Sequence, residues 1–194
     1  LPLTFSILKL LKEKTIVKNA SAYEYMAGLD NLFTDYYGIL TQNTMQIESI
    51  FLEDSQVDKE NLLGLKHLVS NEMFSFFTES ISVNSIAFSA QLHNEVRYFG
   101  NNIECCLIRY LFSLDVNYRN FRNSLQRPII SSSPYLSESK LSYTVIKMDD
   151  KWEYVRLYIK GTPETLLDYM TMFIQPGQVL GKFNKDYYDK IKMK

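Results

Sequence analysis

The stretch SYTVIKMDDKWEYVRLYIKGTPE, residues 142–164, decides the fold of this chain. Two runs rich in β-branched and aromatic residues, 142–148 and 152–159, flank the polar turn 149–151, a pattern typical of a β-hairpin. Apolar residues alternate along the second run, so we expect one of its faces to be buried. The residues expected on that buried face are Val155, Leu157 and Ile159.

A helix is predicted directly after this hairpin. Thr162 before Pro163 has the pattern of an N-cap followed by proline at the first helical position. We therefore expect a helix from Pro163 to about Phe173. Lys160 and Gly161 then lie in the turn between strand and helix.

The remainder of the chain gives an α/β pattern. Helical spacing of apolar residues predicts helices over 5–18, 59–79 and 102–113, and the helix over 59–79 is the longest. Short apolar runs predict strands over 31–34 and 44–52. The fold class expected from the whole pattern is α/β.

Composition limits the function classes. The chain has 194 residues, 46% of them apolar, and 21 basic against 22 acidic residues leave a formal charge of -1. No net field therefore recruits nucleic acid or an anionic membrane. Cys105 and Cys106 are adjacent, which suits neither a disulfide framework nor a zinc site, so a reducing cytosol fits best. The apolar start LPLTFSILKL has only ten residues, about half of the roughly 20 needed to cross a bilayer, and has no signal-peptide pattern.

Asp35 stands at the end of the predicted strand 31–34 and just before a glycine turn. Open α/β sheets place ligands at the carboxyl ends of their strands, so this carboxylate is a candidate nucleophile. The alternative is an aspartate that only caps the turn, which is the commoner role of aspartate beside glycine.

Four segments of the chain, in the same order, carry a resemblance to P-type ATPases. SAYEYMAGLDNLFTDYYGILTQNTMQIE (21–48) resembles their phosphorylation-site segment, whose usual form is close to SACETMGSANxICSDKTGTLTQNxMTVV. Residues 98–122 are similar to the GNKTECALLxF segment, residues 154–169 to the KGAPE segment, and Leu1–Pro2 to the end of PEGLP. The combination of GNxxEC, a tyrosine at 118 and TQNxM resembles the plasma-membrane type of calcium-transporting ATPase.

The resemblance implies a division of the chain. Residues 1–18 would end the link from a transmembrane helix, and residues 19–53 would form the N-terminal part of the phosphorylation domain. Residues 54–180 would form a nucleotide-binding domain with an antiparallel sheet flanked by helices, and residues 181–194 a return helix toward the phosphorylation domain. The hairpin 142–159 would belong to the larger sheet, and a partial α/β unit would surround Asp35.

The same resemblance implies a role for Asp35 as the phosphoryl acceptor. Magnesium would be held by the Asp35 carboxylate together with the backbone carbonyl of Tyr37. The family's DKTGT is DYYGI here, so Tyr36, Tyr37 and Ile39 replace a lysine and two threonines. Phosphoryl transfer depends on accumulated donors and cations, so this replacement argues against residual chemistry at Asp35.

A nucleotide pocket is also implied by the resemblance. PYLSESKLSYTVI matches a segment usually written near FNSxRKxMSTVI, which places Tyr135 at the position that stacks on the base and Lys140 at a retained lysine. Glu104 would contact the adenine edge, Lys160 would lie deep in the pocket, and Gly161 would allow close backbone approach. The alternatives are a solvated Lys160, a Tyr135 that only packs, and a Glu104 that complements the helix dipole.

Motifs of the family that supply magnesium carboxylates, TGD and GDGxND, do not occur in this sequence. The resemblance then implies the ATP-binding portion of a cation pump, most similar to calcium pumps, with ATP and Mg²⁺ as cofactors. Its partners would be the remaining transmembrane and phosphorylation domains of the pump. This portion would face the cytosol and meet the membrane only through those segments. The alternative is a noncatalytic nucleotide-binding or interaction module derived from such a pump.

Overall fold

The computed structural model divides the chain into two compact units, residues 1–43 and 44–194. The residues that the structure describes are 2–52, 55–93, 95–124, 129–136, 138–148, 154–175, 179–183 and 188–189.

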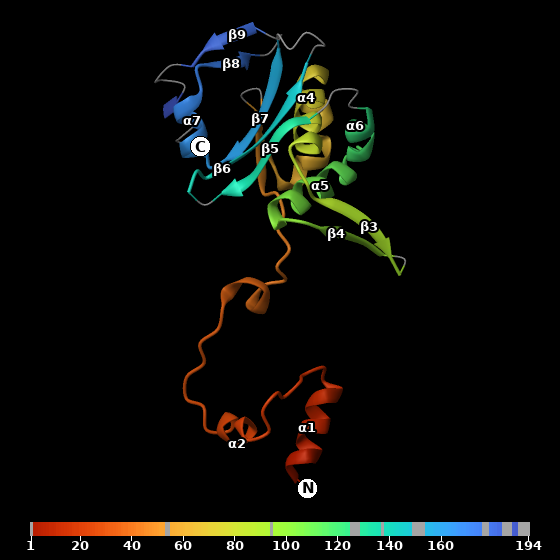
Figure 1. The fold of residues 1–194 in the computed structure, drawn as a ribbon, viewed down its shortest axis with the longest axis vertical. Helices are drawn as coiled ribbons and strands as arrows, with labels where there is room; N and C mark the ends of the chain where they lie inside the picture. Colours follow the sequence, from red (N-terminus) through yellow and green to blue (C-terminus); the bar gives the residue numbers. More distant parts are fainter. Residues whose placement is uncertain are drawn as a thin grey trace. The chain divides into compact units, whose positions relative to one another are not determined.

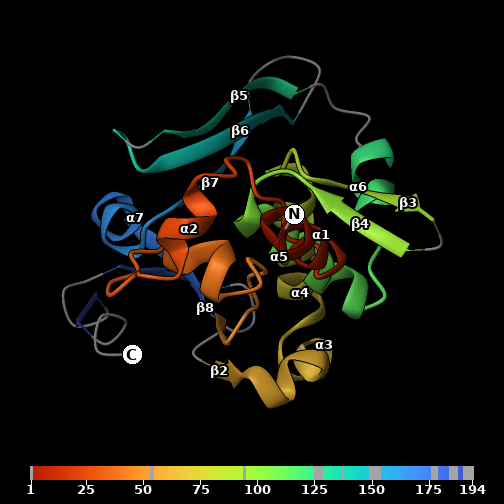
Figure 2. The same cartoon turned by 90° about the horizontal axis from the view of Figure 1, so that it is seen from below.

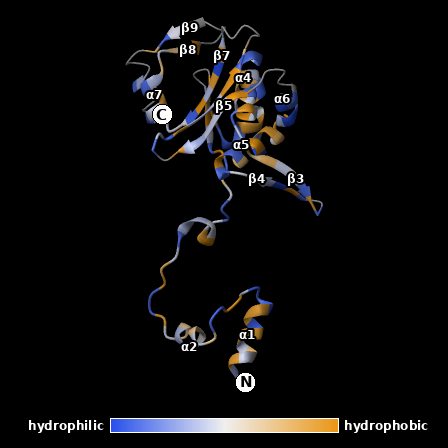
Figure 3. Cartoon of the chain, viewed as in Figure 1, coloured by the Kyte–Doolittle hydropathy of each residue, from blue (hydrophilic) through white to orange (hydrophobic). Residues whose placement is uncertain are grey.

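The first unit has little regular structure. It contains α1 (Pro2–Lys12), α2 (Ala22–Met26) and a kinked turn, η1 (Tyr36–Leu40). Hydrophobic and hydrophilic residues alternate along α1 (Figure 3), and none of its residues is buried. The helix predicted over 5–18 instead begins at Pro2 and ends at Lys12, six residues sooner than expected. The strand predicted over 31–34 is wrong, because a strand needs a hydrogen-bonded neighbour and no described residue pairs with this segment.

The second unit begins with a short hairpin of β1 (Ser49–Leu52) and β2 (Ser55–Asp58). Only the last four residues of the strand predicted over 44–52 are therefore extended in a ladder. The single helix predicted over 59–79 is wrong, because the segment forms three successive helices. They are η2 (Lys59–Gly64), α3 (Leu65–Leu68) and α4 (Asn71–Val83).

The break before α4 has a local cause. Ser70 is extended and its side chain accepts a hydrogen bond from the backbone nitrogen of Met73 at 3.3 Å, so it caps a new helix. Ser70 therefore marks the start of α4, which the apolar periodicity over 59–79 did not indicate.

A second hairpin follows α4, and then two helices. β3 (Phe88–Leu92) pairs antiparallel with β4 (Glu95–Phe99), and this ribbon projects away from the other strands in both views (Figures 1 and 2). The predicted helix over 102–113 is confirmed as α5 (Asn102–Ser113), and α6 (Tyr118–Ser124) follows it.

The largest sheet has the strand order β5 (Ile129–Leu136), β6 (Leu141–Lys147), β7 (Val155–Gly161). All neighbours are antiparallel, which confirms the predicted hairpin and its place in the larger sheet. The predicted turn 149–151 lies outside the described residues. Helix α4 lies against this sheet (Figure 1), so the expected antiparallel sheet flanked by helices is confirmed.

The buried face of β7 is the opposite of the predicted one. Val155 and Leu157 are 55% and 50% exposed, and Ile159 is 41% exposed, whereas Tyr158 is only 9% exposed. Polar partners explain the reversal, since the Tyr158 hydroxyl donates to Glu79 Oε1 of α4 at 2.8 Å. A strand face that carries polar groups can be buried when those groups are hydrogen-bonded, even where the apolar residues of the strand lie on the opposite face.

The last elements differ in part from the prediction. α7 (Pro163–Tyr169) begins as expected but ends before Phe173, because Met170 is extended. The chain then forms a hairpin of β8 (Met172–Gln175) and β9 (Val179–Lys182).

Among the described residues, three hydrophobic clusters form the core of the second unit. One joins α4, α5 and α6 around Ile108, Leu111 and Tyr118, and another surrounds Leu65 next to α5. The third packs α4 against the sheet through Val83, Ile146 and Tyr158. The third cluster fixes α4 relative to the sheet, and residues 84–86 of the candidate site follow directly after α4.

Candidate functional site

Glu104 is placed by the start of α5. Asn101 is extended and its side chain accepts a hydrogen bond from the backbone nitrogen of Ile103 at 2.9 Å, so it caps the helix. Glu104 follows in the first turn, where a negative charge complements the helix dipole. Glu104 can therefore complement the helix dipole and also take part in binding, so the two interpretations of this residue do not exclude each other.

The Glu104 carboxylate is bound on both oxygens. Oε1 accepts from Lys160 Nζ at 2.5 Å. Oε2 accepts from the backbone nitrogens of Ile86 and Ala87, at 3.0 and 3.1 Å, and from Ser85 Oγ at 3.2 Å. Burial raises the pKa of Glu104, but Lys160 and the two backbone amides outweigh burial, so the pKa is lowered overall. The carboxylate is therefore charged at neutral pH.

Lys160 reaches Glu104 because of the register of the sheet. On β6 and β7 the residue pairs Ser142–Lys160 and Thr144–Tyr158 lie opposite each other, and side chains alternate between faces. Tyr158, Ser142 and Thr144 are buried on the face toward α4, so Lys160 points to the same side. The solvated alternative for Lys160 is not what the structure shows, since its side chain is 27% exposed and paired.

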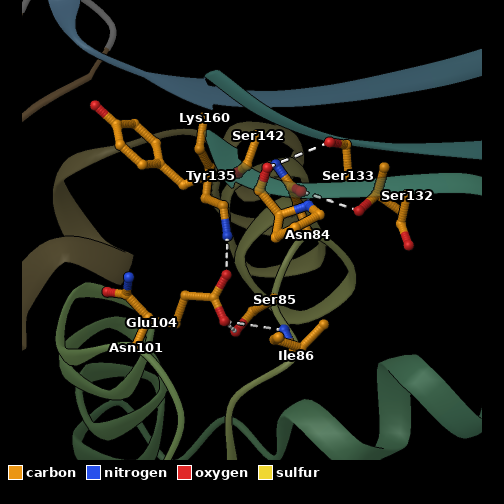
Figure 4. Close-up of a pocket in the computed structure, with 12 residues that line it drawn as sticks. Asn84, Ser85, Ile86, Asn101, Glu104, Ser132, Ser133, Tyr135, Ser142 and Lys160 are labelled. Atoms are coloured by element: carbon orange, nitrogen blue, oxygen red, sulfur yellow. Dashed lines mark hydrogen bonds and ion pairs between the residues drawn. The ribbon is translucent and has the colours of Figure 1, made fainter. Parts of the chain in front are cut away.

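A cleft of about 260 Å³ opens at this ion pair (Figure 4). Figure 4 shows the Lys160 side chain descending from the sheet onto Glu104, with Tyr135 at the margin of the cleft. Tyr135 is 49% exposed, which leaves its ring accessible. The lining residues are Asn84, Ser85, Ile86, Asn101, Glu104, Ser132, Ser133, Pro134, Tyr135, Ser142, Thr144 and Lys160.

Two of the five candidate nucleotide-binding residues do not line the cleft. Lys140 is exposed in the turn between β5 and β6 and has a positive φ of 53°. Gly161 ends β7, and a Cβ there would meet the Leu141 side chain and lie 2.8 Å from the carbonyl oxygen of Lys140. Glycine at 161 thus permits the close approach of β6 to β7. The sequence motifs predicted instead that this glycine would allow the close approach of a ligand.

The family profile described as "P-type ATPase, cytoplasmic domain N" matches residues 72–194, which include the whole cleft. The chain belongs to the P-type ATPases. The resemblance of the sequence motifs is thereby confirmed.

Individual relatives agree with this assignment. Calcium-transporting ATPase 2 of Cryptococcus neoformans is 26% identical over 201 residues, which cover 90% of this chain and 14% of the relative. Plasma membrane calcium-transporting ATPase 1 of Mus musculus is 26% identical over 171 residues, covering 85% of this chain and 14% of the relative. Calcium-transporting ATPase 1 of Saccharomyces cerevisiae is 25% identical over 185 residues, covering 89% and 19%. The chain thus spans less than a fifth of the length of these three relatives.

Asp35, the candidate phosphoryl acceptor of this P-type ATPase segment, lies in the first unit. It is extended and exposed, and it precedes the turn η1, in which Gly38 has a positive φ of 76°. The backbone nitrogen of Gly38 donates to Thr41 Oγ1 at 3.1 Å, which closes the turn. The rings of Tyr36 and Tyr37 meet edge to face with centroids 5.3 Å apart, and both side chains are exposed.

The Asp35 carboxylate and the Tyr37 carbonyl are the two groups predicted to hold magnesium. They are oxygen donors of the kind that Mg²⁺ prefers, and Mg²⁺ usually completes its octahedral shell with waters and substrate phosphates. Nowhere in the described part of the chain do three or more His, Cys, Asp or Glu side chains gather as a metal site would require. Among the same residues, no helix combines the length and hydrophobicity needed to cross a membrane.

Sequence reasoning missed most of the polar lining of the cleft. Ser142 and Thr144 share the buried face of β6 with Ile146, so a correct choice of the inner face would have found them. Asn101 carried a usable signal as an N-cap before an apolar run. Asn84 and Ser85 carried none, because they follow the end of α4 and approach Glu104 only through the tertiary fold.

Proposed function

We propose that the cleft between α5 and the β5–β6–β7 sheet binds ATP. The observation that carries the proposal is the convergence of an aromatic ring, a carboxylate and an ammonium on one cleft, provided by Tyr135, Glu104 and Lys160. These three groups come from β5, α5 and β7, which are far apart in sequence. An adenine base offers a ring face for the aromatic side chain, and donors and acceptors along its edge for a carboxylate and an ammonium that lie 2.5 Å apart.

Each group has a matching part of the ligand. The accessible ring of Tyr135 offers a stacking surface for the base, and base–aromatic stacking contributes roughly 1–3 kcal/mol. A charged Glu104 accepts hydrogen bonds, so it favours the exocyclic amine of adenine over the carbonyl that guanine has at that edge. Lys160 would leave part of its contact with Glu104 and donate to the ligand, since its ammonium has three protons.

The size of the cleft determines how much of ATP it encloses. Its volume of about 260 Å³ lies just below the range of about 300–1,000 Å³ typical of small-molecule pockets. The cleft can therefore enclose the base and the sugar, while the phosphates extend into solvent. Binding to this chain alone should accordingly be weak.

Titration calorimetry of the full chain with ATP tests the proposal. We expect weak but saturable binding, and Lys160→Ala should reduce the affinity between about tenfold and a hundredfold, the range for a charged hydrogen bond. Tyr135→Ala should weaken binding while leaving the Glu104–Lys160 ion pair in place.

A charge-matched control is Lys59→Ala. Lys59 also pairs with a glutamate, Glu48 at 2.9 Å, but it does not line the cleft. Equal losses for Lys160→Ala and Lys59→Ala would point to a general charge effect. Absence of any ATP binding at millimolar concentration would refute the proposal.

We also propose that this nucleotide site serves a calcium-transporting P-type ATPase. Three of its relatives carry that activity in their names, and the chain corresponds to a part of their length. In that assembly this portion would face the cytosol, its partners would be the membrane-spanning and phosphorylation domains, and Mg²⁺ would arrive with ATP as part of the substrate. Asp35 would receive the γ-phosphoryl group of ATP and leave ADP.

The second candidate is a noncatalytic nucleotide-binding module. The observation that favours it is the turn after Asp35, where two exposed tyrosine rings pack together in place of a lysine and a threonine. Loss of one preorganised donor typically costs about 2.7–4 kcal/mol of transition-state stabilisation. We therefore expect that the chain binds ATP yet forms no phosphoenzyme on its own.

Incubation with γ-labelled ATP and magnesium separates the two candidates. An acid-stable, hydroxylamine-sensitive label that appears on the chain and is lost in Asp35→Asn would establish Asp35 as the acceptor and refute the noncatalytic candidate. A variant with Tyr36→Lys, Tyr37→Thr and Ile39→Thr restores the DKTGT sequence and serves as the comparison. Label on this variant but not on the unchanged chain would show that the turn is what prevents the chemistry.

A further inference from the structure

The turn Asn84–Ala87 lies between α4 and β3, and its residues 84–86 line the cleft. Its backbone nitrogens at Ile86 and Ala87 donate to Glu104, as described above. A carboxylate is oriented by such donors only if the donors themselves are held in place. The structure shows what holds this turn.

Arg122 binds two backbone carbonyl groups next to this turn and within it. Its Nε donates to the carbonyl oxygen of Ser82 at 2.8 Å, and its Nη2 donates to the carbonyl oxygen of Ser85 at 2.7 Å. Ser82 belongs to the last turn of α4, whose carbonyls lack helical partners. A guanidinium there satisfies these acceptors and complements the negative end of the helix dipole.

The guanidinium of Arg122 is itself fixed. It is half-buried, and its Cζ lies 4.5 Å from the centroid of the Tyr118 ring, which is 1% exposed. Burial lowers the pKa of Arg122, but a guanidinium keeps its charge at any pH relevant here. Arg122 thus presents two parallel donors from a rigid support, because the α6 helix and Tyr118 both hold it.

Two further contacts complete the support of the turn. Asn84 Oδ1 accepts from Thr144 Oγ1 of β6 at 3.0 Å, which ties the turn to the sheet. On the opposite side, Gly100 approaches so closely that a Cβ there would lie 2.8 Å from the Cβ of Ala87. Gly100 also has a positive φ of 134°, so both its conformation and its surroundings require glycine.

We propose that Arg122 is a positioning residue of the cleft: it fixes the carbonyls of Ser82 and Ser85, and thereby directs the amides of Ile86 and Ala87 at Glu104. Arg122 does not line the cleft and would not touch the ligand. The consequence for ligand affinity rests on the proposed nucleotide binding, whereas the effect on Glu104 does not.

The effect on Glu104 is measured by amide ¹H–¹⁵N spectra recorded across the pH range in which Glu104 titrates. In the unchanged chain the amides of Ile86 and Ala87 should shift as Glu104 takes up a proton, and Glu104→Gln should abolish that shift. In Arg122→Gln the shift should shrink, and the pKa of Glu104 should rise toward its ordinary value. Arg122→Lys, which keeps the charge but has a single donor nitrogen, should restore part of the shift.

Arg119→Gln is the matched control. Arg119 lies on the same helix and also donates to a backbone carbonyl, that of Ser89, but it does not touch the turn. This control should leave the titration of the Ile86 and Ala87 amides unchanged. An equal loss in Arg119→Gln and Arg122→Gln would overturn the proposal, because it would indicate a general weakening of α6.

ATP affinity is the second readout. If the cleft binds ATP, Arg122→Gln should weaken binding roughly fivefold, while Arg119→Gln should not. If the unchanged chain binds no ATP, the proposed function fails and the amide titration still decides the role of Arg122. If Arg122→Gln does not fold, Arg122→Lys decides instead, with a reduced amide shift as support. An amide shift in a folded Arg122 variant equal to that of the unchanged chain would refute the proposal.

Discussion

Glu104→Gln tests the electrostatics of the cleft through its effect on stability. The substitution keeps the shape of the side chain but removes the charge that faces Lys160 at 2.5 Å. It also leaves an amide group opposite donors on both sides, since Lys160, Ile86 and Ala87 all donate to the carboxylate. Charged hydrogen bonds contribute about 1.5–3 kcal/mol, and exposed pairs much less.

The side chains of this pair are 15% and 27% exposed, so the expected loss lies between those limits. We expect about 1–2 kcal/mol at neutral pH. For a chain of this size each kcal/mol corresponds to a change of about 2–4 °C in Tm. Glu95→Gln is the control, because Glu95 meets Arg97 only at 3.7 Å and its side chain is 73% exposed.

The pH dependence gives the sharper result. The pKa of Glu104 is lowered in the folded chain, so its contribution is present above the unfolded pKa of about 4.3 and is lost as pH falls through the folded pKa. Urea unfolding at a series of pH values should therefore show the unchanged chain and Glu104→Gln converging in acid. A stability difference that stays constant from neutral pH to about pH 3 would refute the reasoning.

Three further predictions concern the framework of the domain. The Tyr110 hydroxyl donates to the carbonyl oxygen of Leu62 at 2.7 Å, and burial raises the pKa of Tyr110 to about 12. Tyr110→Phe should therefore lower the free energy of unfolding in urea by about 1–3 kcal/mol. The unchanged chain should lose this advantage as pH rises from about 10 toward 12. Gly161→Ala should lower Tm by overpacking, at a cost of about 1–3 kcal/mol, whereas Gly64→Ala, where a Cβ meets nothing within 4 Å, should not. Tyr158→Phe should destabilise by about 1 kcal/mol and Leu157→Ser by less than about 0.5 kcal/mol; the reverse order in thermal unfolding would restore the original choice of buried face.

Local signals in the sequence were sufficient for several elements. The polar turn between two β-rich runs predicted the β6–β7 hairpin, and apolar spacing after Asn101 predicted α5 with its first and last residues. In both cases the residues that decide the structure are neighbours in sequence. The glutamate and the lysine of the cleft were likewise named from short motifs.

Long-range contacts account for what the sequence did not reveal. Periodicity on β7 favoured its apolar face as the buried one. The opposite face is buried instead, where Tyr158 bonds to Glu79, and this hydrogen bond joins residues 79 positions apart and leaves no local pattern. The turn that holds Glu104 and the arginine that supports it were missed for the same reason. The strand before Asp35 was predicted from composition alone, and composition does not supply the neighbouring strand that a ladder needs.

The cleft at Glu104 and Lys160 is proposed to be a nucleotide site. Amide ¹H–¹⁵N spectra of the full chain titrated with ATP test it most directly, since they locate the ligand without a variant. We expect the largest shifts in residues that line the cleft, above all Ile86, Ser132, Ser133 and Lys160, and small shifts in the β8–β9 hairpin. Saturable shifts that centre elsewhere, or no shifts at millimolar ATP, would contradict it.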